Sequence, residues 1–286
     1  MSKTSTTSRI IRPDILRWLP SRWEEFIGNY RLIRHFKNLL KKIRRMTRDG
    51  DVIDRNQLCF LLTGESRSGK TALVKFLVRC IVCRELDEST LNPCPGTCPA
   101  CAQKPAQCGL SGLNSTLIAH DADGTETVPI HFAVIDCTLI HTTEQLRNRL
   151  VEMSEDCDGI RILYFDEVHR LIRHGMDEML LKAVEDKQAV WFFSTAKPKD
   201  LEDMFKNRLL KLATELPTRD EMASWLFDRC IQWGIPFENE AIIRVVEKSN
   251  CIVGTALHAL ALASIDDKTG LTLDLVENDW VVKLDE

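Results

Sequence analysis

The sequence has no long hydrophobic run and no apolar segment at its start. None of its spans reaches the ~20 apolar residues that a membrane-crossing helix needs. The first residues, Met1 to Ser8, are rich in serine and threonine and lack the apolar core of a secretory signal. We therefore expect a cytoplasmic protein with no membrane partner.

The chain also lacks an excess of basic charge. Lysine and arginine number 38 against 42 aspartates and glutamates, which gives a net charge of −4. Any binding to nucleic acid must therefore come from a local basic surface. A length of 286 residues leaves room for one large domain or two smaller ones.

The stretch from Gly64 to Thr71 reads G-E-S-R-S-G-K-T and fits the pattern G-x-x-x-x-G-K-[ST]. It follows an apolar run at 58–62 and precedes a helical pattern at 72–79, the order that a phosphate-binding loop requires. Backbone N–H groups of such a loop close round a triphosphate, the lysine reaches the β and γ phosphates, and the hydroxyl holds Mg²⁺. We expect the whole loop to bind nucleotide: Gly64, Glu65, Ser66, Arg67, Ser68, Gly69, Lys70 and Thr71. A chance glycine-rich turn is the alternative interpretation.

A second motif joins a buried strand to two carboxylates. Apolar residues at 162–165 run into Asp166 and Glu167, as at the carboxyl end of a parallel strand that meets bound Mg²⁺. Asp166 is expected to hold the metal through Thr71 and water, and Glu167 to orient and deprotonate the attacking water. The pair is weak evidence alone, but the phosphate loop about 95 residues earlier strengthens it.

Eleven cysteines in a cytoplasmic chain indicate metal binding or free thiols rather than disulfides. Six of them gather on a proline-rich stretch: Cys80, Cys83, Cys94, Cys98, Cys101 and Cys108. Spacing of the kind C-x₃-C-x₂-C lets thiolates converge on one tetrahedral zinc ion, and a closed set of thiolates leaves no position for catalytic water. Structural zinc contributes on the order of 10 kcal/mol, enough to fix a loop with little core of its own. Unrelated free thiols are the alternative.

Helical periodicity begins at Tyr30, and basic residues fill the positions between the apolar ones. Lys37, Lys41, Arg44 and Arg48 fall on one stripe of this helix. The stripe is a candidate surface for the phosphates of duplex DNA, which would give weak sequence preference and steep salt dependence. A solvated helix face is the alternative.

Further periodic segments predict an α/β fold: a P-loop core with a parallel sheet flanked by helices, a zinc-binding insertion and a small all-α lid. Strands are expected at 130–136 and 189–195, helices at 143–152 and 201–212, and an exposed connection at 109–129. Beyond Pro217 the pattern is helical, with segments at 219–233, 239–249 and 255–265. The expected divisions are a tail at 1–17, the core at 18–216 with its insertion at about 80–108, the lid at 217–268 and a tail at 269–286.

Two motifs carry a resemblance to a known family. Residues 18–28, W-L-P-S-R-W-E-E-F-I-G, are similar to the lead-in W-R-P-x-x-F-x-D-[VI]-[VI]-G, and residues 165–174, F-D-E-V-H-R-L-I-R-H, are similar to I-D-E-V-H-x-L-S-R-H. Both patterns belong to AAA+ ATPases of the clamp-loader branch. With its cysteine cluster, the sequence most resembles the zinc-bearing tau/gamma type of bacterial DNA polymerase III, over about residues 18–268.

The resemblance implies further roles. The cofactors would be ATP, Mg²⁺ and Zn²⁺, with Phe26, Ile27 and Gly28 lining the adenine pocket. Zinc would be held by Cys83, Cys94, Cys98 and Cys101, with Cys108 as the substitute. Arg208 falls where the family has an arginine finger that acts on a neighbour's ATP. A homo- or hetero-oligomer is therefore implied, with duplex DNA and a further protein as partners.

The sequence departs from the family at four places. The sensor-1 position falls at Ala196, one past Thr195, which stays a candidate catalytic residue. Leu257 replaces the sensor-2 arginine, and Arg67 stands where relatives often have glycine. The chain ends at Glu286 without the collar domain of clamp loaders, so we do not expect a standard loader subunit. An arginine finger contributes about 10³ to 10⁵ in rate, so we expect slow hydrolysis that assembly or DNA stimulates.

Three functions remain open on the sequence alone. The first is a DNA-dependent ATPase, similar to clamp-loader motors, that remodels or loads a partner in replication or repair. The second is a transposon- or phage-type AAA+ regulator that forms ATP-dependent rings or filaments on DNA. The third is a scaffold that uses ATP only to hold its interfaces. The missing sensor residues favour the third function, whereas Glu167 and Arg208 argue against it.

Overall fold

The computed structural model describes residues 14–49, 58–102, 115–117, 130–152, 160–186, 189–265 and 270–280. The chain divides into two compact units. One is Pro20–Glu215, and the other combines Met1–Leu19 with Leu216–Glu286. Among the described residues, no helix has both the length and the apolar character needed to cross a bilayer.

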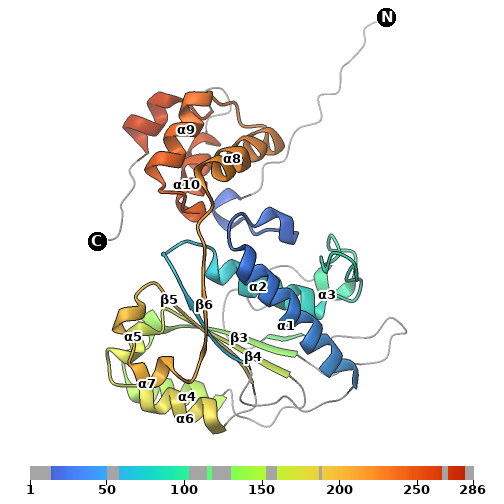
Figure 1. Ribbon diagram of the computed structural model, residues 1–286, viewed down its shortest axis with the longest axis vertical. Coiled ribbons are helices and arrows are strands. Elements are labelled where there is room, and N and C mark those ends of the chain that lie inside the picture. The colour runs from blue at the N-terminus through green and yellow to red at the C-terminus, as the bar shows by residue number, and fades with distance from the viewer. Residues whose placement is uncertain are drawn as a thin grey trace, which may run out of the picture. The chain divides into compact units, whose positions relative to one another are not determined.

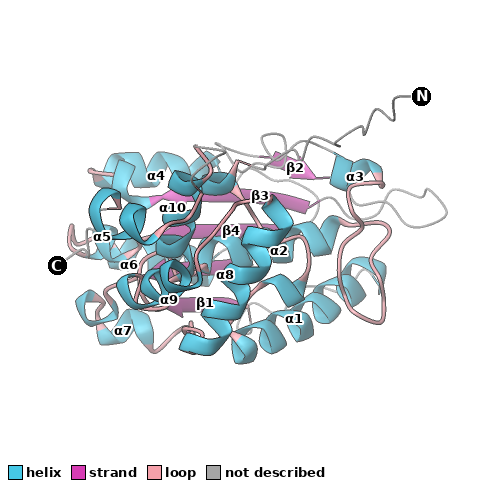
Figure 2. Ribbon diagram, turned by 90° about the horizontal axis from the view of Figure 1, so that it is seen from above, coloured by secondary structure: helices cyan, strands magenta, loops and turns pink. Residues whose placement is uncertain are grey.

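The larger unit is built on one sheet with the strand order β2-β3-β4-β5-β1-β6 (Figure 2). Its strands are β1 (Cys59–Thr63), β2 (Ser115–Leu117), β3 (Ile130–Asp136), β4 (Ile160–Asp166), β5 (Val190–Thr195) and β6 (Leu210–Ala213). Strands β1 and β3 to β6 pair in parallel, and β2 pairs antiparallel with β3. The register sets Thr63 beside Thr195 and Asp136 beside Asp166, so the carboxyl ends of the central strands meet at one edge.

Helices cover both faces of this sheet (Figure 1). One face packs against α1 (Tyr30–Asp49) and α2 (Lys70–Val82), with strand residues such as Phe60, Tyr164 and Phe192 in the shared core. The other face packs against α4 (Thr143–Glu152), α5 (His169–Ile172), α6 (Asp177–Asp186) and α7 (Asp203–Lys206). Successive side chains of a strand point to opposite faces, so strands covered on both sides read as continuous apolar runs. The predicted α/β fold with a parallel sheet flanked by helices is confirmed.

The structure overturns the predicted helix at 201–212. A short 3₁₀ turn (Pro198–Asp200) and helix α7 occupy its first part, and strand β6 occupies its second part. Leu201, Phe205 and Leu209 are buried four residues apart, which imitates a helical face in the sequence. β6 pairs instead with β1 along the edge of the sheet, because that pairing satisfies the backbone groups that β1 would otherwise leave open.

Other predicted segments agree with the structure. Strand β3 and helix α4 have the bounds that the pattern indicated, and β5 begins one residue later. The predicted connection at 109–129 contains strand β2, while its remaining residues lie outside the described part of the chain.

The smaller unit consists mainly of α8 (Arg219–Trp233), α9 (Asn239–Lys248) and α10 (Val253–Ala263). Thr218 and Glu221 form a capping box at the start of α8. The guanidinium of Arg229 lies 5.1 Å from the ring centre of Trp18, 5.7 Å from that of Trp225 and 6.0 Å from that of Trp233. Cation–π contact therefore joins residue 18 to α8.

Candidate functional site

The phosphate loop lies between the end of β1 and the start of α2. Gly64 has φ +145°, and a Cβ there would lie 1.8 Å from Thr214 Oγ1, so only glycine fits. Gly69 has φ +95° immediately before α2. Arg67 has φ +61°, a left-handed conformation that favours glycine. Keeping arginine in this conformation costs about 1 kcal/mol or more.

Lys70 begins α2 and is 5% exposed. Its Nζ donates hydrogen bonds to the carbonyl oxygens of Gly64 (2.9 Å) and Glu65 (2.8 Å). Burial lowers the pKa of Lys70, while the charges of Glu167, Asp166 and Glu65 act in the opposite direction. A buried ammonium at the N-terminus of a helix makes this loop suitable for the phosphates of a nucleotide.

Thr71 lies against the carboxyl end of β4. Its Oγ1 donates to Asp166 Oδ2 at 3.0 Å, so the hydroxyl and the carboxylate that suit Mg²⁺ are in direct contact. We expected these two groups to share a metal and a water, and the structure shows them adjacent enough for one ion. The residues therefore fit a triphosphate with Mg²⁺: a phosphate cradle, a buried cation and two oxygen ligands.

Two residues that the sequence reasoning missed hold Asp166. The Tyr164 hydroxyl lies 2.9 Å from Thr71 Oγ1, 3.0 Å from Asp166 Oδ1 and 2.9 Å from Ser194 Oγ. Ser194 Oγ also donates to Asp166 Oδ1. Burial and the charge of Asp166 raise the pKa of Tyr164, so the phenol keeps its proton and donates. The period of a strand could have indicated Tyr164, which lies two residues before Asp166 on the same face.

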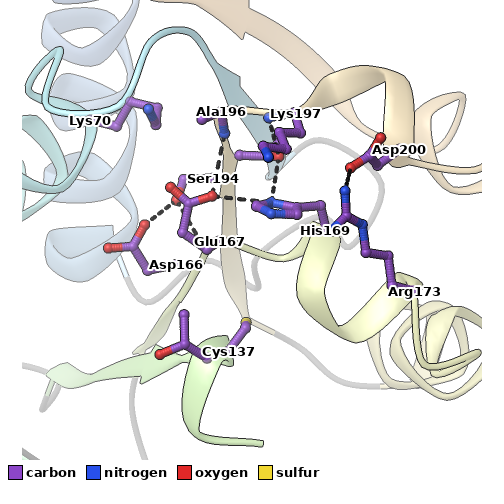
Figure 3. A network of polar contacts seen from close by, with 12 residues as sticks. Lys70, Cys137, Asp166, Glu167, His169, Arg173, Ser194, Ala196, Lys197 and Asp200 are labelled. Carbon is purple, nitrogen blue, oxygen red and sulfur yellow. Dashed lines mark hydrogen bonds and ion pairs between the residues drawn. The ribbon is translucent and has the colours of Figure 1, made fainter. Parts of the chain in front are cut away.

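Glu167 follows β4 with φ +55° and is held through one carboxylate oxygen. Its Oε2 lies 3.1 Å from His169 Nδ1 and accepts from Ala196 N at 3.4 Å. Figure 3 shows Glu167 with Ser194 and Asp166 on one side and His169 on the other. A left-handed conformation in a residue other than glycine is a strain of the kind that functional sites retain.

Thr195, a candidate catalytic residue, lies beside His169. Its Oγ1 lies 3.0 Å from His169 Nδ1 and accepts from Lys197 N at 2.9 Å. Ser194, one residue earlier, contacts Asp166 instead. Successive residues of β5 thus contact two neighbouring groups, and His169 Nδ1 lies between Thr195 and Glu167.

The lead-in segment meets the phosphate loop through Asn29. Phe26 is buried against Trp23 and Phe76, and Ile27 is partly buried. Gly28 has φ +64°. Asn29 Nδ2 donates to the carbonyl of Ser68 at 3.5 Å, and its Oδ1 accepts from Glu215 N at 2.9 Å. The segment that we expected to line the adenine pocket is therefore bonded to the loop that holds phosphates.

Arg208 lies apart from this constellation. It follows α7, is exposed, and its Nε lies 3.0 Å from Glu185 Oε1 on α6. An exposed ion pair of this kind contributes about 0–1 kcal/mol. The pair therefore leaves the guanidinium free to exchange partners.

Four cysteines after α2 form a second candidate site. The Sγ atoms of Cys83, Cys94, Cys98 and Cys101 all lie within 4.8 Å of one another. Backbone N–H groups of Cys94, Cys98 and Cys101 donate to the sulfur of the preceding cluster cysteine, at 3.2, 3.4 and 3.4 Å. Hydrogen bonding, first of all from Cys101, lowers the pKa of Cys83 to about 5. Such a donor set suits one tetrahedral zinc ion; the predicted substitute Cys108 lies outside the described residues.

A phosphate loop between β1 and α2, with paired carboxylates at the end of β4, defines a P-loop nucleotide-binding protein of the α/β class. Residues 53–205 match the model of the AAA domain family. The match covers more than half of the chain, and the chain therefore belongs to this family. Its members are ATPases, and ATP with Mg²⁺ is the ligand that the family implies.

Solved AAA+ structures share this fold. A point mutant of RuvB of Thermotoga maritima superposes with a TM-score of 0.55 at 15% identity, covering 91% of this chain and 71% of that chain. PCH-2 of C. elegans superposes with a TM-score of 0.53 at 14% identity, covering 90% of this chain and 68% of that chain. At these identities the likeness shows the fold alone. A comparison with curated proteins finds no match.

Proposed function

We propose that the chain is an ATP-hydrolysing motor of the clamp-loader type that assembles into an oligomer on duplex DNA and acts on a protein partner. The observation that carries the proposal is the meeting of Thr71 and Asp166 at 3.0 Å, with Glu167 as the next residue along the chain. This arrangement unites a phosphate loop, a metal site and a base for water. A module that only bound nucleotide would have no need of the third group.

The residues divide the chemistry between them. Lys70 and the N–H groups of the loop bind and orient the phosphates. Thr71 and Asp166 would hold Mg²⁺, which would supply positive charge beside the β and γ phosphates. Glu167 orients the attacking water and accepts its proton. Ser194 and Tyr164 keep the Asp166 carboxylate in place, because each donates a hydrogen bond to it.

Hydrolysis in this proposal depends on assembly. Arg208 acts on the ATP of a neighbouring subunit, which is consistent with its exposed position and its weak pairing with Glu185. The smaller unit serves as the lid, and Leu257 cannot supply the charge of a sensor-2 arginine. Intrinsic turnover is therefore slow and rises when subunits assemble.

We further propose that the four cysteines bind structural zinc. Their segment is also held by Arg44, which donates to the Cys83 carbonyl at 2.8 Å, and by Arg79, which donates to the Cys94 carbonyl at 2.9 Å. Zinc at this position would match the tau/gamma type within the clamp-loader branch.

Two members of the basic stripe predicted on α1, Lys37 and Arg44, are partly buried, whereas Lys41 is exposed. Arg44 points to carbonyl groups at the end of α2, and Lys37 lies 5.8 Å from the ring of Trp23. The Arg48 side chain lies outside the described part of the chain. The exposed residues of α1 include Arg34, Asn38, Lys41 and Arg45, spaced as one helical face. We assign phosphate contacts to Arg34, Lys41 and Arg45.

Steady-state ATP hydrolysis with and without duplex DNA, beside ATP binding, tests the proposal. Lys70→Ala should abolish binding. Glu167→Gln should bind ATP normally but lose about 10² to 10⁴ in turnover, the usual contribution of a positioned base. Glu144→Gln, an exposed change on α4, is the matched control and should behave like wild type.

Turnover by the Glu167→Gln variant at the wild-type rate would refute the assignment of the base. Tight ATP binding by the Lys70→Ala variant would refute the phosphate loop. Electron microscopy of the same samples distinguishes closed rings, expected for a loader-like motor, from filaments on DNA, which would replace this proposal by the regulator of mobile elements.

A further inference from the structure

We propose that His169 positions the Glu167 carboxylate for catalysis by donating a hydrogen bond from Nδ1, with Thr195 fixing the imidazole ring. The inference rests on the proposed ATPase function, in which Glu167 is the base. It assigns a positioning role to His169 and Thr195, which lie outside the phosphate loop; His169 contacts Glu167, and Thr195 contacts His169.

The contacts leave Glu167 dependent on this donor. Its side chain is 26% exposed, and a carboxylate at the end of two methylene groups has several rotamers open to it. Two nitrogens lie close to Oε2: His169 Nδ1 is 3.1 Å away, and the Ala196 N–H donates to it at 3.4 Å. His169 is 2% exposed, so its own position is set by packing.

The geometry also assigns the tautomer of His169. A bare nitrogen lone pair 3.1 Å from Glu167 Oε2 would repel the carboxylate, so we assign the proton to Nδ1. Nε2 is buried and has no hydrogen-bond partner among the described residues, which suits a bare lone pair better than an N–H group. The ring is therefore neutral and protonated at Nδ1. Burial, with the charges of Arg170 and Arg173, lowers the pKa of His169 against the opposing charges of Glu167 and Asp200, consistent with a neutral ring.

Thr195 completes the support. Its hydroxyl oxygen accepts from Lys197 N at 2.9 Å and also from the His169 Nδ1–H group, whose nitrogen lies 3.0 Å away, so one proton is shared between Thr195 and Glu167 and the ring is fixed by the backbone that follows β5. The contacts of Thr195 with His169 and of His169 with Glu167 therefore connect the proposed base to strand β5. The residue at the sensor-1 position, Ala196, contributes its backbone N–H to the same oxygen.

A matched pair of substitutions tests the hydrogen bond. Leucine and asparagine have the same branched shape, but asparagine carries an N–H donor at the place of Nδ1, and leucine has none. His169→Leu should lower kcat on the order of 10²-fold, as a misplaced catalytic group does, with ATP affinity and KM unchanged. His169→Asn should restore kcat on the order of tenfold relative to leucine, in line with a hydrogen bond to a charged group.

A second pair of substitutions tests the contribution of Thr195. Thr195→Val removes the hydroxyl and keeps the shape, and it should reduce kcat less than His169→Leu does, whereas Thr195→Ser should stay close to wild type. Equal kcat values for the leucine and asparagine variants, or losses that fall on KM instead of kcat, would overturn the positioning role.

NMR spectroscopy tests the contact between His169 Nδ1 and Glu167 independently of ATP turnover. In ¹⁵N-histidine-labelled full-length protein, His169, assigned by its absence in the His169→Asn variant, should show a protonated Nδ1 and a bare Nε2. Glu167→Ala should shift the Nδ1 resonance, and Glu144→Ala should not. A wild-type ring protonated at Nε2 would refute the inference. Absence of ATP turnover in the wild type would refute the proposed function, while the spectrum would still decide the contact.

Discussion

Helix α2 carries a different kind of site at each end. Its N-terminus follows the phosphate loop, and Lys70, the first residue of the helix, donates to two carbonyl oxygens of that loop. Its C-terminus leads into the four cysteines, and Arg44 donates to carbonyl oxygens there, including that of Cys83. The helix dipole favours an anion at the first end and a cation at the second, so the phosphate loop and the guanidinium of Arg44 each lie at the end that suits their charge.

The two ends differ in what orders them. At the nucleotide end, strands β1, β4 and β5 fix the backbone, and Tyr164 and Ser194 bond to Asp166. At the cysteine end, helix α3 (Pro99–Ala102) is short, and the described residues from Cys83 to Thr97 form turns and irregular structure. A site made of strand ends is preorganised, whereas a site made of turns needs its ligand to fold. Loss of the ligand should therefore affect the two ends unequally.

Removal of metal is the largest expected effect. Chelation, or the Cys98→Ser substitution, should unfold the cysteine segment, because structural zinc contributes on the order of 10 kcal/mol to such a site. Hydrogen exchange should rise over residues 83–102 and remain low in β1, β4 and β5. Trp23 gives a local probe, since its Nε1 donates to the Leu91 carbonyl at 2.8 Å.

The control for this change is Cys80→Ala. Cys80 is fully buried in the core beside α1 and lies outside the four-sulfur cluster, so its loss should leave the zinc content unchanged. A wild-type chain that purifies without zinc, or a cysteine segment equally protected with and without chelator, would contradict the comparison between the two ends.

The nucleotide end was predictable because its chemistry is local in the sequence. The phosphate loop and the pair Asp166 and Glu167 each occupy consecutive residues, and the buried strands before them read as apolar runs. The residues that support them were missed for the opposite reason. Ser194 meets Asp166 through a register between β4 and β5 that sequence does not contain. His169 was read as part of a motif, but its contact with Thr195 depends on the same register.

Two differences between the sequence pattern and the structure have a common physical cause. The segment 201–212 shows one helical period, although a strand at the edge of the sheet takes its last residues. Of the predicted basic stripe at Lys37, Lys41, Arg44 and Arg48, Lys41 is exposed but Lys37 and Arg44 are partly buried, because charged side chains with long apolar stems also suit partly buried positions. Periodicity locates the apolar face of a helix well, but it does not distinguish charged side chains that border this face from those that are fully exposed.

In the proposed assembly, Arg208 acts at the nucleotide site of a neighbouring subunit. Its substitution is expected to have the next largest effect. Arg208→Ala should leave ATP binding intact and lower assembly-stimulated hydrolysis by about 10³ to 10⁵, as for other arginine fingers. Mixing is the sharper measurement. Subunits with Arg208→Ala retain Glu167, and subunits with Glu167→Gln retain Arg208, so mixed assemblies should recover hydrolysis at sites that combine the two intact groups.

Mixtures that stay as inactive as each variant alone would contradict an action in trans. Glu185→Gln serves as the control for the ion pair at 3.0 Å. Because that pair is exposed and weak, its removal should leave the mixing result unchanged.

The smallest effects are expected for substitutions of two adjacent arginines of α1, Arg44 and Arg45, and they should differ in kind. Arg44 contacts carbonyls at the cysteine end of α2, whereas Arg45 is exposed on the face assigned to DNA. Arg44→Met should cost about 2 kcal/mol of unfolding free energy, because it removes a charged donor from several carbonyls, and leave DNA binding unchanged. Arg45→Met should leave stability within about 0.5 kcal/mol and reduce the salt slope of DNA binding by about one. Denaturant unfolding and a salt titration measure both variants. The opposite result would be a loss of stability in Arg45→Met and a loss of DNA binding in Arg44→Met. It would mean that Arg45 contacts the cysteine segment, and it would contradict the assignment of the exposed face of α1 to DNA.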